Sequence, residues 1–355
     1  MFKNKKATLV SAILSLVLIL SGCGLLGGGK KQEIDPPKEE TYSDGDQTTT
    51  AEQAETKKDK ASEEQVSSIP TELYLLDKNG YIVPQTLNLP KTNSVAKQAL
   101  EYLVQNGPIT EMLPNGFKAV LPVDTKLSVS IKDKTATVDF SKEFSNYKPE
   151  EEMKILQAVT WTLTQFDSVE KVKLQMNGHE LTKMPVNGTP IEGTLSRKNG
   201  INIDTADVVD ITNTKAITVY YIGGEEGSNY YVPITKRVSS EENNNIKATV
   251  AELVSGPVHS SHLLTEFLPD VKLLDDPKID NGVVTLNFNE AIYGGLKENM
   301  ISKQLLDSLV LSLTEQSGIK EVAVKVNGKS ELVNEKGDKL SEPVTRPENV
   351  NTGSF

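Results

Sequence analysis

The chain repeats itself at a spacing of about 150 residues. Four landmarks recur in the same order in both halves: a Gly-Pro after a helical stripe, a Leu-Pro, a strand that ends in Phe, and an Asn-Gly. They lie at Gly107-Pro108 and Gly256-Pro257, Leu121-Pro122 and Leu268-Pro269, Phe140 and Phe288, and Asn177-Gly178 and Asn327-Gly328. Several landmarks that recur at one period indicate a duplicated structural unit. The sequence therefore predicts two copies of one module in tandem.

Each copy has the same predicted order of elements. A β-rich segment opens it, at Glu72–Leu76 and at Ile217–Ile222, and a helix with one apolar stripe follows. A hairpin, a second amphipathic helix and a last strand complete the order β-α-β-β-α-β, with an additional irregular or strand segment near Tyr81. Short alternating strands and singly striped helices favour an α+β fold. We expect each module to be a two-layer α/β sandwich with its helices on one side of a small sheet.

Residues 1–22 have the pattern of a lipoprotein signal peptide. Lysines precede the uncharged run Ala7–Leu20, which is short for a membrane span. The small residues Ser21 and Gly22 stand before Cys23, the only cysteine of the chain. This pattern is a bacterial lipobox, and it predicts that Cys23 becomes a lipidated N-terminus, held durably in the membrane by two or three acyl chains. The alternative is an ordinary cleaved signal peptide.

Composition and the repeat set the other boundaries. From Gly24 to about Ile69 the sequence is rich in Gly, Lys, Glu, Asp, Thr and Gln and cannot bury enough apolar surface to fold. We therefore expect a disordered acidic tether before the modules. The connector contains Ile191, Leu195, Ile201 and Ile203, and we expect it to pack, whereas the C-terminal tail is expected to fray. The expected parts are the lipidated cysteine and tether at 23–69, the first module at 70–186, the connector at 187–210, the second module at 211–344 and the tail at 345–355.

The charge and the histidine content argue against two classes of function. The net charge is -11, which opposes binding to nucleic acid and to anionic lipid headgroups. His259 and His262 form a weak metal-binding pattern, and we interpret them as part of a solvated loop.

Glu150, Glu151 and Glu152 could serve as catalytic acids of a cell-wall hydrolase, but three acids at a helix start are explained by the helix dipole. We predict no catalytic residue, metal or cofactor.

Aromatic side chains are the best candidates for an interface. Trp161 is the only tryptophan, and Tyr220, Tyr221, Tyr230 and Tyr231 form a cluster in the second copy that the first copy mostly lacks. Local packing is the favoured interpretation for all five. An exposed aromatic would instead be an interaction hot spot or a platform for a glycan.

The lipobox, the acidic tether and the two modules with their Gly-Pro, Leu-Pro, Phe and Asn-Gly landmarks resemble the GerM family of sporulation lipoproteins, which carry two GerMN domains. The resemblance extends from Met1 to about residue 340. It implies a function in sporulation and spore germination. The modules also resemble the ring-building motif of secretion and sporulation channel proteins.

By analogy, the resemblance implies a non-enzymatic assembly protein in the apparatus between mother cell and forespore. It would be anchored through Cys23 to the extracytoplasmic face of the cell membrane, in the mother cell, facing the intermembrane space. Its partners would be other sporulation envelope or channel proteins. Peptidoglycan is the alternative partner, and a cell-wall hydrolase is a further alternative.

Overall fold

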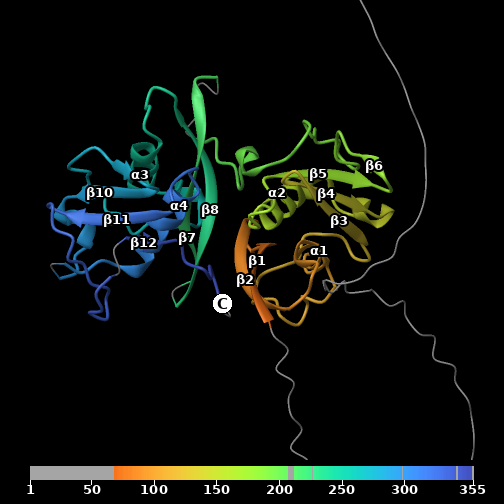
Figure 1. Ribbon diagram of the computed structural model, residues 1–355, viewed down its shortest axis with the longest axis horizontal. Coiled ribbons are helices and arrows are strands. Elements are labelled where there is room, and N and C mark those ends of the chain that lie inside the picture. The colour runs from red at the N-terminus through yellow and green to blue at the C-terminus, as the bar shows by residue number, and fades with distance from the viewer. Residues whose placement is uncertain (1–67, 207–211, 226, 298, 341–342, 354–355) are drawn as a thin grey trace, which may run out of the picture. The chain divides into compact units, whose positions relative to one another are not determined.

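The computed structural model describes residues 68–206, 212–225, 227–297, 299–340 and 343–353. Cys23 and the tether lie outside the described residues. These described residues belong to one compact unit, in which the element order of the first module recurs in the second (Figure 1). None of the helices that the structure describes is both long and apolar enough to cross a membrane.

The first module combines a β-hairpin with a separate four-stranded sheet. The sheet has the order β3-β4-β5-β6, and β4 and β5 are parallel because helix α2 connects them. The elements are β1 (Ser68–Leu76), β2 (Ile82–Pro90), α1 (Val95–Glu101), β3 (Leu127–Lys132), β4 (Thr135–Phe140), α2 (Glu152–Leu163), β5 (Lys171–Met176) and β6 (His179–Glu180), with short 3₁₀ turns at Lys142–Ser145, Pro149–Glu151 and Arg197–Asn199.

The second module has a similar sheet, with the order β12-β11-β10-β9 and a parallel pair β10–β11. Its β12 pairs with β11 at Val322, as Leu195 bridges Val172 in the first module. The hairpin of the second module is longer, with twelve residues in each strand. The elements are β7 (Thr214–Glu225), β8 (Ser228–Ser239), α3 (Asn245–Ser255), β9 (Lys278–Asp280), β10 (Val283–Phe288), α4 (Lys303–Thr314), β11 (Glu321–Val326) and β12 (Val344–Thr345), with 3₁₀ turns at His259–Ser261 and Glu290–Tyr293.

The predicted fold class, tandem α+β modules, is confirmed, but the first strand of each copy has a different place from the expected one. The segment after Tyr81 is strand β2, which pairs with β1 along its whole length. Asp77 Oδ1 accepts hydrogen bonds from the N–H groups of Asn79 and Tyr81 and so closes the turn. Each hairpin is therefore a two-stranded sheet of its own, and α2 contacts both the hairpin and β5 of the main sheet.

Equivalent residues have equivalent roles in the two cores. Phe140 and Phe288 are buried at the ends of β4 and β10. Asp139 and Asn287 each accept a hydrogen bond of 2.9 Å from the glycine N–H of the following Asn-Gly turn. The asparagine of both turns has a positive φ, a conformation that Asn tolerates well. The turn that ends each module is thus held by the preceding strand.

The prediction for the tail was wrong, because part of it is buried. Val350 and Asn351 are 2% and 8% exposed, and both hydrogen-bond to the hairpins. In the connector, Ile191 and Ile201 are buried, as is Leu195, whereas Ile203 is 44% exposed. Both segments that follow a module therefore return to the folded body.

Candidate functional site: the junction of the two modules

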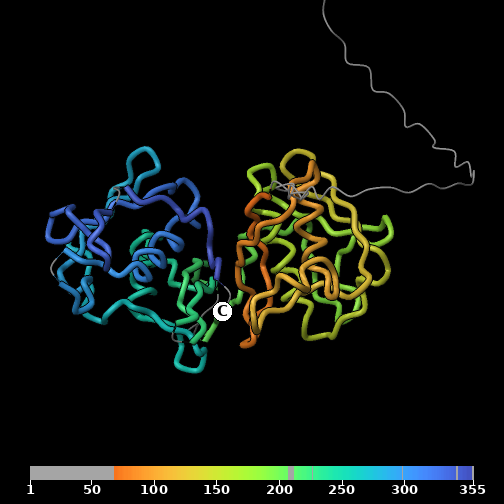
Figure 2. The backbone as a smooth tube through the Cα atoms, turned by 90° about the horizontal axis from the view of Figure 1, so that it is seen from below, coloured from red at the N-terminus to blue at the C-terminus, as the bar shows by residue number. Residues whose placement is uncertain are grey.

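The modules meet through their hairpins, with β2 of the first against β8 of the second (Figures 1 and 2). The connector enters this junction at Ile201, whose carbonyl accepts a hydrogen bond of 2.8 Å from Thr235 N and whose N–H donates to Thr235 Oγ1. Asn202 follows and joins the two hairpins. Its Nδ2 donates to the carbonyls of Ile82 and Pro233, at 2.7 and 2.9 Å, and its Oδ1 accepts from Ile82 N.

The C-terminal segment enters the same junction from the other module. Val350 O accepts a hydrogen bond of 3.0 Å from Thr86 N, and Val350 N donates to Thr86 Oγ1. Asn351 Nδ2 donates to the carbonyls of Tyr231 and Pro84, at 2.9 and 2.7 Å. Its Oδ1 accepts a hydrogen bond of 2.8 Å from Tyr231 N.

These two sets of contacts are equivalent by exchange of the modules. Asn351 corresponds to Asn202 in the repeat, and each Asn bonds twice to the hairpin of the module that it follows and once to the other hairpin. Both Asn residues have a positive φ, 45° and 57°. An interface in which the same groups meet in exchanged positions is isologous, as in a two-fold dimer. The tandem modules therefore pack as a pseudo-two-fold pair within one chain.

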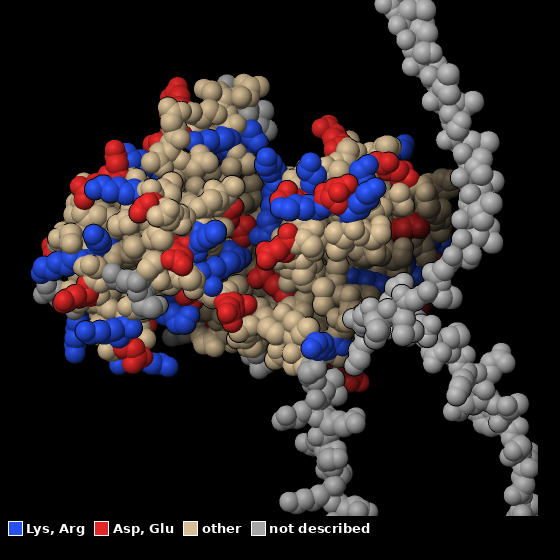
Figure 3. Space-filling model, in the orientation of Figure 1, with Lys and Arg blue, Asp and Glu red and all other residues tan. Residues whose placement is uncertain are grey.

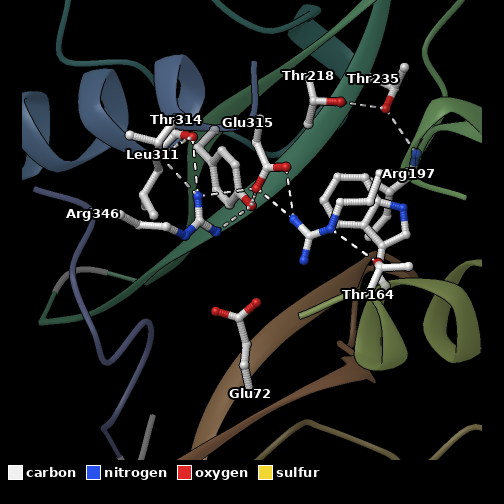
Figure 4. Close-up of polar contacts among 12 residues, drawn as sticks. Glu72, Thr164, Arg197, Thr218, Thr235, Leu311, Thr314, Glu315 and Arg346 are labelled. Carbon is white, nitrogen blue, oxygen red and sulfur yellow. Dashed lines mark hydrogen bonds and ion pairs between the residues drawn. The ribbon is translucent and has the colours of Figure 1, made fainter. Parts of the chain in front are cut away.

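Two arginines close the junction at a single carboxylate (Figure 4). Arg197 follows the first module and bonds both carboxylate oxygens of Glu315 at 2.8 Å. Arg346 follows the second module and lies 3.1 Å from Glu315 Oε1. The Tyr220 hydroxyl donates to the same carboxylate at 2.8 Å. The C-terminal end of α4 is thus tied to both segments that follow the modules.

Each arginine is also oriented by the module that precedes it. Arg197 donates to Thr164 Oγ1 at 3.1 Å and lies over the Trp161 ring at 4.4 Å. Arg346 donates to Thr314 Oγ1 at 3.3 Å and lies over the Tyr220 ring at 5.5 Å. A guanidinium over an aromatic face is attracted to the ring in addition to its ion pair.

Glu315 has no acidic counterpart in the first module. Glu315 follows Thr314, and the equivalent residue after Thr164 is Gln165. Gln165 instead accepts a hydrogen bond of 2.8 Å from Glu72 N. Burial by itself would raise the pKa of Glu315, but the charges of Arg197 and Arg346 outweigh burial and lower this pKa to about 2. Glu315 is therefore ionised at neutral pH although its side chain is only 8% exposed.

The aromatic residues singled out from the sequence lie within the fold. Trp161, Tyr220, Tyr221 and Tyr230 are all less than 5% exposed, and Tyr231 is half-buried. Trp161 Nε1 donates to the connector at Gly200 O, 3.2 Å away. The hydroxyls of Tyr221, Tyr230 and Tyr231 also donate, to Glu252 O and to the carboxylates of Asp77 and Asp307. A function of these side chains in binding a partner stays a prediction.

The buried acid at the start of α2 has a structural role. Glu152 is 1% exposed, and its carboxylate accepts hydrogen bonds from the N–H groups of Val186, Asn187 and Thr189, where the connector begins. Burial raises its pKa, but these donors and the Tyr147 hydroxyl lower it to about 2. Within the described ranges, no group of three or more His, Cys, Asp or Glu side chains could hold a metal ion.

Sequence reasoning missed Arg197, Asn202, Glu315, Arg346 and Asn351. A signal for four of them exists, because Arg197 to Asn202 and Arg346 to Asn351 share the pattern Arg-x-x-x-Ile/Val-Asn at the spacing of the other landmarks. The second occurrence lies in the segment that we expected to fray. No comparable signal marks Glu315, which lies at a glutamine position of the first copy.

Replacing Glu315 with Gln is expected to lower the free energy of unfolding by about 3 kcal/mol at pH 7, because two arginines lose a desolvated partner. The folded-state pKa of Glu315 lies below that of the unfolded chain. Its contribution is therefore present above about pH 4.5 and lost as the pH falls toward 2. Urea denaturation from pH 7 to pH 2 measures both effects. The same replacement at Glu180, which is half-exposed in its pair with Lys173, is the control and should cost less than about 1 kcal/mol. Equal losses of unfolding free energy for the two variants would contradict the prediction.

Replacing Asn351 with Ala is expected to loosen the junction, because Tyr231 N and two carbonyls lose buried hydrogen bonds, at a cost of about 2 kcal/mol. Limited proteolysis within the connector measures the loosening. Removal of residues 346–355 should have a larger effect. The control is Asn349→Ala, since Asn349 is exposed. Unchanged proteolysis of the Asn351 variant would mean that the hairpins hold the modules together without it.

Comparison with known proteins identifies the family of this chain. The sequence profile of the Germane family, described as sporulation and spore germination, matches residues 72–182 and 218–332. The chain is 57% identical over 366 residues to the spore germination protein GerM of Bacillus subtilis (strain 168), and each chain is covered completely. The solved tandem GerMN domains of the sporulation protein GerM from Bacillus subtilis are 61% identical, with a TM-score of 0.77, over 81% of this chain and all of that chain. The resemblance inferred from the sequence is thereby confirmed: the chain belongs to the GerM family of sporulation and spore germination proteins, with two GerMN domains in tandem.

Proposed function

We propose that the protein is a non-catalytic assembly component of an envelope complex between mother cell and forespore. The observation that carries the proposal is the isologous junction, in which two modules are packed into one body by their hairpins and by both following segments. Such an arrangement presents the outer surfaces of both modules in a constant relation, which suits a protein that holds partners together. Family membership supports the sporulation setting.

The acidic side chains that could have been catalytic, Glu151 and Glu152, have structural roles. Glu152 accepts three backbone hydrogen bonds and has a pKa of about 2, so its carboxylate is a poor general acid at neutral pH. Glu151 accepts a hydrogen bond of 2.9 Å from Lys148 N and caps the start of its helical turn. These acids stabilise the fold at the positions where a hydrolase would need reactive groups.

The surface supports recognition of partners by local features. On the face drawn in Figure 3, Lys and Arg side chains are interspersed with Asp and Glu, so neither sign forms a broad field there. Peptidoglycan is the second candidate partner. Glycan platforms use exposed aromatic faces, and no Trp, Tyr or Phe among the described residues is fully exposed. Protein partners are therefore favoured over glycan.

The assembly role is tested by placing photoreactive side chains across the exposed positions of both modules, in the full-length protein in sporulating cells. We expect discrete envelope proteins to be captured at a few clustered positions and identified by mass spectrometry. Variants of His259 or Glu150, both outside the junction, should leave the spore yield unchanged. Capture of glycan alone would contradict the assembly role and favour wall binding.

We also propose that the protein is anchored to the membrane through a lipidated Cys23. Because it is the only thiol of the chain, Cys23→Ala removes every thioether attachment site. We expect the variant to move from the membrane fraction to the soluble fraction and to lose incorporation of labelled palmitate. The immunoblot level of the whole-cell protein is the control for degradation. A variant that stays in the membrane fraction would show that another segment holds the protein there.

A further inference from the structure

The two modules differ at one edge of the main sheet. Strands β3 and β9 are the outermost strands at equivalent edges. β3 pairs with β4 over six consecutive residues, whereas β9 pairs with β10 over only three. The second edge also pairs at Leu273 and Leu274, so one module has a continuous outer strand where the other has an interrupted one.

An insertion explains the short strand. Lys126 O accepts a hydrogen bond from Ser141 N, and Lys272 O accepts one from the equivalent Asn289 N, so both edges begin at the same point. The first edge then reaches its hairpin turn after Lys132 and the second after Asp280, two residues later in relation to the repeat. The two additional residues fall within Asp275-Asp276-Pro277. Proline and inserted residues at an edge block the addition of another strand.

The outer side of β3 presents backbone groups that no other strand of the described residues pairs. Hydrogen bonds alternate along an antiparallel pair, and Lys126 bonds toward β4 through Ser141. Ser128, Ser130 and Lys132 share that direction, so the N–H and C=O groups of Leu127, Val129 and Ile131 point away from β4. Within the described part of the chain, no strand lies beyond β3.

The side chains of β3 suit an added strand. Leu127, Val129 and Ile131 pair with Phe140, Val138 and Ala136, which are buried. Leu127 and Val129 are half-buried against the core, where α1 contacts β3, whereas Ile131 is 43% exposed. A further strand would shield this apolar row.

The charge of the edge defines the chemistry of the occupant. Residues 126–134 contain three lysines and one aspartate, and Lys134 is paired with Glu170. The equivalent residues 272–282 contain two lysines and three aspartates, of which Asp276 is paired with Lys247. Lys126 and Lys132 are exposed at the two ends of β3. In an antiparallel pair of two β3 strands centred on Val129, Lys126 would lie opposite Lys132, and like charges in that position are destabilising. The edge thus disfavours a second copy of itself and suits an acidic strand.

We propose that β3 is the docking edge for an extended acidic segment of a partner protein, which adds to the sheet as an antiparallel or parallel strand. The proposal rests on the assembly role and specifies the surface that would perform it. Backbone hydrogen bonds would supply affinity, the apolar row would accept alternate side chains, and the two lysines would select an acidic sequence.

The test places a photoreactive side chain at Ile131 of the full-length protein in sporulating cells, with Ile279 at the equivalent position of the interrupted edge as the matched control. We expect a crosslink at Ile131, at least ten times stronger than at Ile279, to a segment whose peptides identify it as acidic. The double variant Lys126→Glu, Lys132→Glu should lower the crosslink at least tenfold, whereas Lys272→Glu, Lys278→Glu should not. Val129→Pro, which removes one outward N–H, should abolish it, and a thermal melt of each variant confirms folding.

The outcomes separate this proposal from the assembly role. Crosslinks to envelope proteins elsewhere on the modules, with none at Ile131, would overturn the docking edge and leave the assembly role standing. No protein crosslink at any position would overturn both. The docking edge would also be overturned if the captured segment is basic or belongs to a second copy of this chain. It would be overturned as well if the crosslink yield is unchanged in the Lys126→Glu, Lys132→Glu variant.

Discussion

The ionised carboxylate of Glu315 between two arginines is the interaction on which the arrangement of the modules depends. Removing a carboxylate from water costs several kcal/mol, and only close cations and hydrogen bonds offset that cost. Here the cations come from the two segments that follow the modules, and Tyr220 adds a hydrogen bond. The carboxylate is stabilised only when both segments have returned to the junction, so one buried charge links the connector, the tail and α4.

Around that charge, the junction has the pseudo-two-fold symmetry of a dimer interface. Asn202 and Asn351 make equivalent bonds to exchanged hairpins, and Ile201 and Val350 pair with equivalent threonines. A duplicated module that once paired with an identical copy would give this geometry, and fusion in one chain lets the two halves diverge. Glu315 shows such divergence, since the equivalent position in the first module is Gln165.

Much of the module could be predicted because its signals are local. Alternation at Leu127, Val129 and Ile131, and the Asn-Gly turns after the last strands, identify elements within a few residues of chain. The first strand was misplaced, since alternation shows that a strand exists without showing which strand it pairs with. The tail was misjudged because a short polar segment with a proline resembles a disordered end.

The sequence by itself determined the duplication, the α+β class of each module and the family, because these depend on periodicity, turn residues and the order of landmarks. The tertiary structure alone decided that the tail is part of the core and that the tyrosine cluster lies inside the fold. Asn351 binds Pro84 across 267 positions of sequence. Which polar groups become buried opposite one another depends on how two finished modules pack, and no local pattern carries that information.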